Sequence, residues 1–499
     1  MTEPARVMVL GFDAMDPATV LALAEDGTLP TFRRLLTGAV MARIDNPYGT
    51  FIGNTWSSFS SGWCAARTGC HSTDEIAGGT YIHRRTPFES KRGTPFWREL
   101  DHGSRRVAAL DVPHTVAIEP AVHGVELSEW GAHDRHSGPR LRSTGSCADL
   151  IDRFGYHPVF GVEPDLARDF APDDYVHREG DLRTEAEEEA LLADFHAGAE
   201  RKSALSTHVL ASGPWDLFIS VAGEAHAVGH QHWYLHDPSH PRHDPALARR
   251  IGDPLARIYA QLDRSLAAHL ALAGNDTLVL VVLSHGMGPH YDGSAVLNEV
   301  LRRLDTVRAG MPAAFRDQPP RLYAGEADRR RQRFYRMPNN DHIGGVRLNL
   351  RGREPDGRVD PAHAADEMEW LRAELLNLVN VDTGAGAVRA VERAEDHHAR
   401  SPGDAFPDLF IEWNHDAPIT TVSSPSIGTV HCVVAQWRTG DHRPAGLLLA
   451  TGAHLGRSAI MPPVAMLDMA PTIMAALGVE PGDLDGAAIP WLAAPVTVA

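Results

Sequence analysis

A carboxylate and two imidazoles occur close together near the middle of the chain, at Glu224, His226 and His230. They follow residues 215–220, an apolar run with the length of a buried strand. Carboxylate and imidazole groups are the usual protein ligands of divalent transition metals. If a helix follows the strand, His226 and His230 share one face of it. The segment therefore predicts a metal site, although a polar loop is the simpler alternative in a chain with 28 histidines.

Two further apolar runs end in residues that can bind a metal. Asp13 closes the run 6–13, which is typical of a parallel strand buried on both faces. Open α/β sheets place their sites at such carboxyl ends. His285 follows 276–283, the strongest strand pattern in the chain. Asp13 and His285 are therefore candidate ligands, with a turn residue as the alternative for Asp13.

A fourth candidate, His442, lies in the segment 439–444. Gly, Asp and Pro are frequent there, so we expect a turn. The run 446–450 that follows is expected to be a strand. His442 thus adds a fourth separated source of metal-binding side chains.

Hydroxyl groups are concentrated in the segment 49–62. Asn54 or Thr55 is predicted to cap a helix that carries Trp56 and Phe59 inward. A hydroxyl at a helix N-terminus lies in a positive field that favours anions. The alternative is an ordinary helix cap without a catalytic role.

The elements that must position these residues indicate an α/β chain. Further strands are expected at 105–113, 344–350 and 408–413, and helices at 251–272 and 466–478. Two polar, irregular regions separate these elements. We therefore predict a core formed by 1–113 and 215–499, an insertion or cap at 114–214 and a smaller insertion at 290–343.

Composition restricts the possible partners and compartments. The chain has 499 residues, of which 43% are hydrophobic and 22% are charged, and its formal net charge is −18. An acidic chain of this kind is not expected to bind nucleic acid as its main partner. Its four cysteines show no short paired spacing, which is typical of a reducing compartment. No secretory signal and no apolar run of about 18 residues is present, so we expect a cytoplasmic protein that does not span a membrane.

Taken in order, these pieces resemble the alkaline phosphatase superfamily, nearest its type I phosphodiesterase/nucleotide pyrophosphatase branch. The matching pieces are 11–13, 56–62, 226–230, 285–287, 349–355, 440–444 and 468–472. The resemblance implies a doubly wound, mostly parallel sheet with helices on both faces. It also implies a site for one or two divalent transition-metal ions, for which we expect zinc.

The resemblance also distributes the candidate ligands. One ion would take His230, His442 and a ligand from the pair Glu224 and His226. A second ion would take Asp13 and His285, which we expect to form the weaker site.

Three positions depart from the family pattern. The family usually has Asp at the position of His226, and Asp-His where this chain has Ser284-His285. The second ion would thus have lost one carboxylate ligand and would keep Asp13. The usual position of the nucleophile falls on Ile52, which cannot attack a substrate.

Thr55 and Thr50 are the nearest hydroxyls to Ile52. We predict Thr55 as the nucleophile and Asn54 as a donor to a substrate oxygen. Attack by water is the alternative.

These features predict a metal-dependent hydrolase of a phosphate, phosphonate or sulfate ester, with a small-molecule phosphodiester as the expected substrate. Two alternatives remain. One is an enzyme of the same fold with altered chemistry, such as group transfer or elimination, and the other is a metal-binding homologue without catalysis. The sequence does not indicate an oligomeric state.

Overall fold

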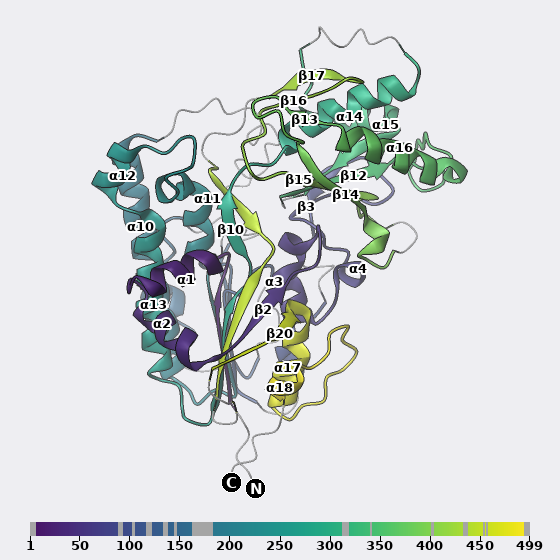
Figure 1. The fold of residues 1–499 in the computed structure, drawn as a ribbon. Helices are drawn as coiled ribbons and strands as arrows, with labels where there is room; N and C mark the ends of the chain where they lie inside the picture. Colours follow the sequence, from purple (N-terminus) through teal and green to yellow (C-terminus); the bar gives the residue numbers. More distant parts are fainter. Residues whose placement is uncertain are drawn as a thin grey trace.

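A nine-stranded sheet forms the centre of the protein (Figure 1). The computed structural model describes residues 6–87, 93–101, 105–115, 122–132, 138–143, 147–161, 183–311, 319–339, 342–400, 404–432, 438–452, 455 and 458–493. In spatial order the strands are β20 (Ala459–Ala465), β2 (Val40–Asp45), β19 (Gly446–Thr451), β9 (Thr277–Leu283), β1 (Arg6–Phe12), β8 (Leu217–Ala222), β5 (Val107–Leu110), β6 (Gly124–Ser128) and β7 (Arg140–Ser143). Neighbouring strands from β9 to β6 run parallel, whereas β19 and β7 are antiparallel to their neighbours.

The central strands are mostly apolar, and helices cover both faces of the sheet. In β1, Met8 and Leu10 belong to the core on one face, and Val7 and Val9 belong to the core on the other. The first core is completed by α1 (Pro17–Glu25), α2 (Pro30–Gly38), α7 (Leu150–Phe154), α10 (Glu185–Ala211), α11 (Glu224–His236), α12 (Pro245–Ile251) and α13 (Pro254–Leu270). The second is completed by α3 (Phe51–Ser61), α6 (Trp97–Asp101), α17 (Met469–Ala476) and α18 (Pro490–Ala493). The expected doubly wound α/β fold is confirmed.

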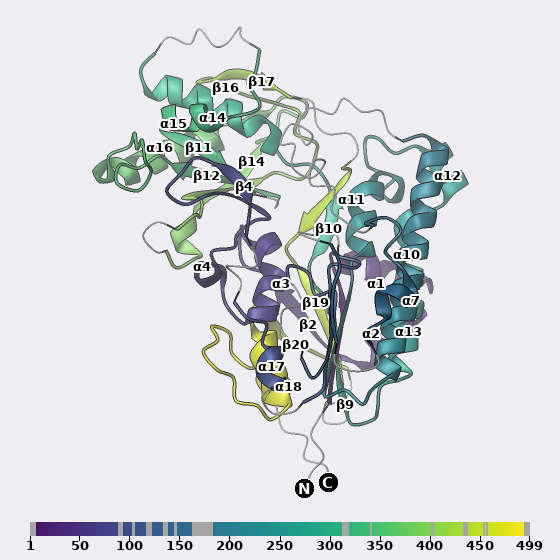
Figure 2. The same cartoon turned by 180° about the vertical axis from the view of Figure 1, so that it is seen from behind.

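A smaller lobe lies beyond one end of the main sheet (Figures 1 and 2). It contains a four-stranded sheet in the order β11 (Phe334–Met337), β12 (Ile343–Leu348), β15 (Leu409–Trp413) and β14 (Val388–Arg393). A three-stranded sheet of β13 (Val379–Asn380), β16 (Thr421–Ser424) and β17 (Gly428–His431) stands beside it. The lobe also contains α14 (Ser294–Arg308), α15 (Glu326–Arg331) and α16 (Ala364–Leu376), and it has an apolar core of its own.

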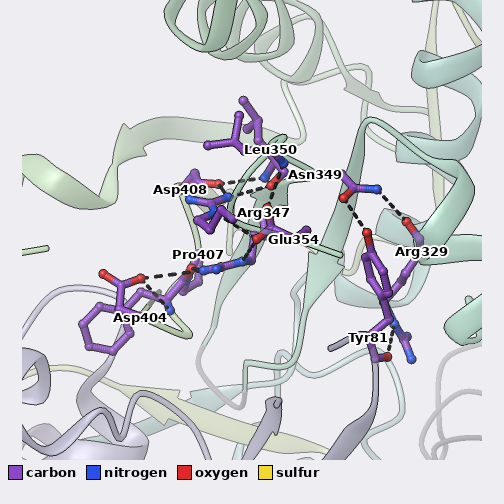
Figure 3. A network of polar contacts seen from close by, with 12 residues as sticks. Tyr81, Arg329, Arg347, Asn349, Leu350, Glu354, Asp404, Pro407 and Asp408 are labelled. Carbon is purple, nitrogen blue, oxygen red and sulfur yellow. Dashed lines mark hydrogen bonds and ion pairs between the residues drawn. The ribbon is translucent and has the colours of Figure 1, made fainter. Parts of the chain in front are cut away.

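A buried network of ion pairs holds the smaller lobe together (Figure 3). Arg347 on β12 donates to Glu354 at 2.7 Å, and Arg353 donates to both carboxylate oxygens of Asp408 at 2.7 Å. The backbone nitrogen of Leu350 donates to the second oxygen of Glu354 at 2.8 Å. Both oxygens of each carboxylate therefore accept hydrogen bonds. The segment 349–355, which carries part of the family resemblance, has a structural role here.

The two regions predicted as insertions form regular structure. Within 114–214, strands β6 and β7 extend the main sheet and α10 packs on one of its faces. Within 290–343, α14, α15 and β11 build part of the smaller lobe. Among the helices described, none is long and apolar enough to cross a membrane.

The prediction that Asn54 or Thr55 caps a helix is wrong. Helix α3 begins at Phe51, and Thr50 is its N-cap residue. The chain turns earlier because Gly49 adopts a φ of +68°, a conformation that glycine permits. Thr55 is therefore inside the helix, where its hydroxyl donates to the carbonyl of Phe51 at 2.7 Å.

The predicted turn at 439–444 is also wrong. Residues Gly440–Arg443 form strand β18, which pairs antiparallel with β10 (Gly286–Pro289). In this pairing Met287 is opposite His442. The partner strand supplies hydrogen bonds that the local sequence does not show, so a turn-rich composition becomes a strand.

Candidate metal centre

The carboxyl ends of three parallel strands bring the candidate residues together. Asp13 follows β1, helix α11 follows β8, and His285 follows β9. These strands are neighbours in the sheet, in the order β9, β1, β8. The β10–β18 pair rises from the same edge and contacts α11 (Figure 1). Asp13, His226, His230, His285 and His442 therefore lie near one another.

Three histidines point one nitrogen each toward a common centre. The Nε2 atom of His226 is 2.9 Å from Nε2 of His230 and 2.8 Å from Nε2 of His442. All three side chains are buried, and their ligand atoms lie within 4.8 Å of one another. The first two belong to α11, where the predicted spacing of four residues puts them on one face.

The other nitrogen of each ring is close to an acceptor. Nδ1 of His226 is 2.7 Å from Asp13, and Nδ1 of His230 is 2.8 Å from the carbonyl of Gly440. Nδ1 of His442 is 3.5 Å from Asp441. Carboxylate and carbonyl oxygens can only accept here, so the Nδ1 atoms of His226 and His230 donate. Metal-binding histidines are held by this kind of outer partner, which fixes the ring and leaves Nε2 as the ligand.

The arrangement of the Nε2 atoms is unfavourable for neutral rings alone. A neutral imidazole that donates through Nδ1 presents a lone pair at Nε2. The facing Nε2 atoms of His226 and His230 then oppose each other at 2.9 Å. A divalent cation between the rings turns this repulsion into coordination, so the donor set fits a transition metal such as zinc.

Asp13 is buried and accepts three hydrogen bonds. Its Oδ1 atom accepts from the Trp56 indole at 2.7 Å and from the Ser284 hydroxyl at 3.0 Å, and its Oδ2 atom accepts from His226. Burial alone would raise the pKa of Asp13, but its interactions with His226, and with His285 and Trp56, hold the pKa well below its usual value. Asp13 is thus a stable carboxylate that orients His226.

His285 lies at the edge of this group. Its Nε2 atom is 3.6 Å from Asp13, which is too long for a hydrogen bond. Its ring lies near Phe51 and His442, with centroid separations of 5.4 and 5.1 Å. Among the described residues, Asp13 and His285 belong to no group of three candidate ligands with donor atoms within 4.8 Å of one another.

Glu224 is not brought to the three histidines. It is fully buried at the start of α11, where its carboxylate is 3.6 Å from Nε2 of His157. His226, two residues further along the same helix, belongs to the group of three histidines. Of the predicted pair Glu224 and His226, only the histidine faces the centre.

The two threonines at the start of α3 differ in their hydrogen bonds. Thr55 donates to the Phe51 carbonyl, and its oxygen is also 2.9 Å from the side-chain oxygen of Asn46. The buried hydroxyl of Thr50 has no hydrogen-bond partner among the described residues. Asn54 is buried, and its side-chain oxygen likewise lacks such a partner within the described part of the chain.

Trp56, Asp441 and Asn46 are not among the site residues predicted from the sequence. Trp56 donates to Asp13, and Asp441 is next to the ring of His442. The amide of Asn46 donates to the carbonyl of Ser284 at 2.8 Å and to that of Pro444 at 2.7 Å. For Asp441, the position directly before His442 was the available signal. For Asn46 the sequence offered none.

A second group of possible ligands consists of His290, Asp292 and Asp441. His290 is 2.7 Å from Asp292, and Arg438 donates to Asp441 at 2.9 Å. Burial would lower the pKa of His290, but the charge and hydrogen bond of Asp292 raise it above its usual value. These charges already balance one another, so the group is a network of ion pairs beside the centre.

The fold and the site define an α/β protein with a buried centre of three histidines. A family model of type I phosphodiesterase / nucleotide pyrophosphatase matches residues 7–443, so the chain belongs to this family. No curated protein matches the sequence.

Solved structures show the same fold at low sequence identity. Phosphonoacetate hydrolase from Sinorhizobium meliloti, in complex with phosphonoformate, is 13% identical with a TM-score of 0.54, and 95% of this chain and 96% of that chain are covered. The murine ectonucleotide pyrophosphatase / phosphodiesterase 5 is 11% identical with a TM-score of 0.50, and 97% of each chain is covered. Both likenesses agree with the expected alkaline phosphatase-like fold.

Proposed function

We propose that the protein is a metal-dependent hydrolase that cleaves a small-molecule phosphodiester. The observation that carries the proposal is the convergence of three Nε2 atoms from His226, His230 and His442, each on a ring whose other nitrogen lies near an oxygen. The family supplies the phosphate-ester class of substrate. The phosphonate bound to the hydrolase from Sinorhizobium meliloti is consistent with a substrate centred on phosphorus.

His226, His230 and His442 would hold the ion, and zinc is the ion that we propose. A bound divalent ion acts as a Lewis acid, lowering the pKa of a nucleophile and polarising a phosphoryl oxygen. Three protein ligands are typical of catalytic zinc sites, which keep one position open. The chain's own contribution is to fix the three rings and to exclude water from around them.

We assign the nucleophile to Thr50 in preference to Thr55. Thr50 caps an 11-residue helix, and hydroxyls at this end lie in a positive field that stabilises developing negative charge. Its buried hydroxyl has no hydrogen-bond partner among the described residues, whereas Thr55 already donates within α3. The next residue, Phe51, contacts His285 and His442. Asn54 remains our candidate donor to a substrate oxygen.

The smaller lobe offers groups that would contact the substrate. His342 lies beside Phe51, with ring centroids 5.9 Å apart, and His415 lies 4.8 Å from His342. Burial, with a contribution from Arg443, lowers the pKa of His342 to about 4. At neutral pH His342 is therefore uncharged and can donate or accept a hydrogen bond.

Metal content and turnover test the proposal together. The protein is purified without added metal, analysed for bound elements, and assayed with chromogenic phosphodiesters, phosphomonoesters, phosphonates and sulfates. We expect about one ion or more per chain, diesterase activity above the other activities, loss with a chelator and recovery with zinc. Less than about a tenth of an equivalent, with no gain on reconstitution, would contradict metal dependence. Full metal content without hydrolysis of any ester would instead favour altered chemistry on the same fold.

A further inference from the structure

A site for two ions needs ligands for the second ion. The hydrogen bonds of Asp13 indicate whether Asp13 can be one of these ligands. Asp13 and His285 are the only candidates that the resemblance offers. A second ion would compete with the donors that hydrogen-bond to Asp13. This question rests on the proposed function, because it concerns the same centre.

Both oxygens of Asp13 are engaged by donors from different elements. Oδ1 accepts from Trp56 on α3 and from Ser284, which follows β9. Oδ2 accepts from His226 on α11. The three donors come from three different elements, and an ion that bound Asp13 would compete with them for the lone pairs of its carboxylate.

Two hydrogen bonds hold the hydroxyl group of Ser284 against Asp13. Its hydroxyl donates to Asp13 at 3.0 Å and accepts from the backbone nitrogen of Ala14 at 3.1 Å. Ser284 is fully buried. A serine at this position also removes the carboxylate that the family pattern has there, so of the two predicted ligands of a second cation only Asp13 carries a negative charge.

We infer that the centre holds a single ion on His226, His230 and His442, and that Asp13 is a positioning residue for His226 instead of a ligand. Ser284 and Trp56 hold Asp13 in this role. The hydrogen bond from His226 to Asp13 keeps the ring oriented and makes its Nε2 a stronger ligand. His285 lies beside this group, with its Nε2 atom 3.6 Å from Asp13.

Ion counting provides the direct test. The protein is stripped with a chelator, equilibrated with excess Zn²⁺, desalted and analysed for zinc per chain. One ion is the expected result. Two retained ions would overturn the inference and leave the proposed hydrolase intact, whereas none would contradict the proposed function itself.

Two variants of Ser284 provide a second test of the number of zinc ions per chain. Ser284→Asp restores the missing carboxylate and should raise the retained zinc from one ion to two, while the uncharged control Ser284→Asn should stay at one. A folded Ser284→Asp that retains one ion would contradict the role given to Ser284.

Asp13→Asn tests the positioning role without adding a charge. It should weaken the single ion by about 10-fold to 100-fold in a zinc-competition titration, as expected for loss of an outer partner. If Asp13 were instead a ligand of a second ion, this variant would lose one ion of two and hold the other with unchanged affinity.

Discussion

Two buried polar clusters, one in the smaller lobe and one at the end of the main sheet, differ in how their side chains are paired. In the smaller lobe, Arg347 and Arg353 face Glu354 and Asp408, and each carboxylate oxygen accepts a hydrogen bond (Figure 3). At the end of the main sheet, His226 brings its Nε2 atom within 2.9 Å of two other imidazole nitrogens. In the first cluster, positively charged guanidinium groups face negatively charged carboxylates. In the second, nitrogen atoms of three imidazole rings face one another.

The difference indicates which cluster is built for a ligand. Buried charges that are fully paired stabilise one arrangement of the chain, and removing one partner leaves the other uncompensated. Buried lone pairs that converge are unfavourable unless a cation joins them. The lobe network is therefore expected to control stability, and the histidine centre to control metal content and turnover.

The largest effect is expected from His442→Ala. Loss of one of three ligands should reduce bound zinc by at least about tenfold and turnover by at least about 10⁴-fold. The free energy of unfolding of the metal-free protein should change little by comparison. Elemental analysis, turnover and denaturant unfolding are measured on the same preparation.

His431→Ala is the matched control, because His431 is an exposed histidine on β17 of the smaller lobe. It should keep full metal content and turnover. A His442→Ala protein with wild-type zinc would show that the ion binds elsewhere.

The second largest effect is expected from Thr50→Ala. Loss of the nucleophile should lower turnover by about 10³-fold while zinc content remains unchanged. Thr55→Ala should cost less, since it removes a hydroxyl that donates inside α3 and leaves the nucleophile in place. Single-turnover assays compare the two variants.

If Thr55→Ala is the inactive variant and Thr50→Ala keeps wild-type turnover, the original assignment to Thr55 is right. If both variants and the double variant remain active, attack by water replaces covalent catalysis.

The third prediction concerns the lobe network. Asp408→Asn removes one of the two carboxylates that pair with Arg353, leaving only Glu354, and should lower the free energy of unfolding by about 3 kcal/mol. Zinc content of the folded protein should not change. Asp356→Asn is the control, because Asp356 pairs with Arg330 at the surface and should contribute nothing measurable. Equal stability of both variants in urea unfolding would contradict the contrast between buried and exposed pairs.

The smallest effect is a pH dependence of the same network. Burial raises the pKa of Asp408, but the hydrogen bonds and charge of Arg353, with Arg347 and Arg400, lower it overall. A lowered pKa in the folded state stabilises the protein above the unfolded pKa of about 3.9, and this stabilisation is lost as pH falls through the folded pKa. The difference in unfolding free energy between wild type and Asp408→Asn should therefore be constant from about pH 6 to 8 and should shrink below about pH 4. A difference that grew on acidification would reverse the assigned direction.

The sequence by itself determined the fold class and most of the residues at the centre. The apolar runs 6–13, 215–220 and 276–283 overlap the largely buried strands β1, β8 and β9. Parallel strands align their carboxyl ends, so a side chain that follows each run must lie at one edge of the sheet. The spacing of four between His226 and His230 likewise fixes a shared helix face. Period and strand polarity are local properties, which is why these predictions hold.

Only the tertiary structure decided how the converging residues divide their roles. The pairing of β10 with β18 joins segments about 150 residues apart and brings His442 to the centre, where local composition indicated a turn. The early turn at Gly49 moves the cap from Thr55 to Thr50. Asp13 meets Trp56 and Ser284 from two other elements and accepts a hydrogen bond from each. Each of these features depends on which groups, distant in the sequence, lie within about 3 Å of one another. Hydrogen bonds of that length depend on how the helices and strands pack together.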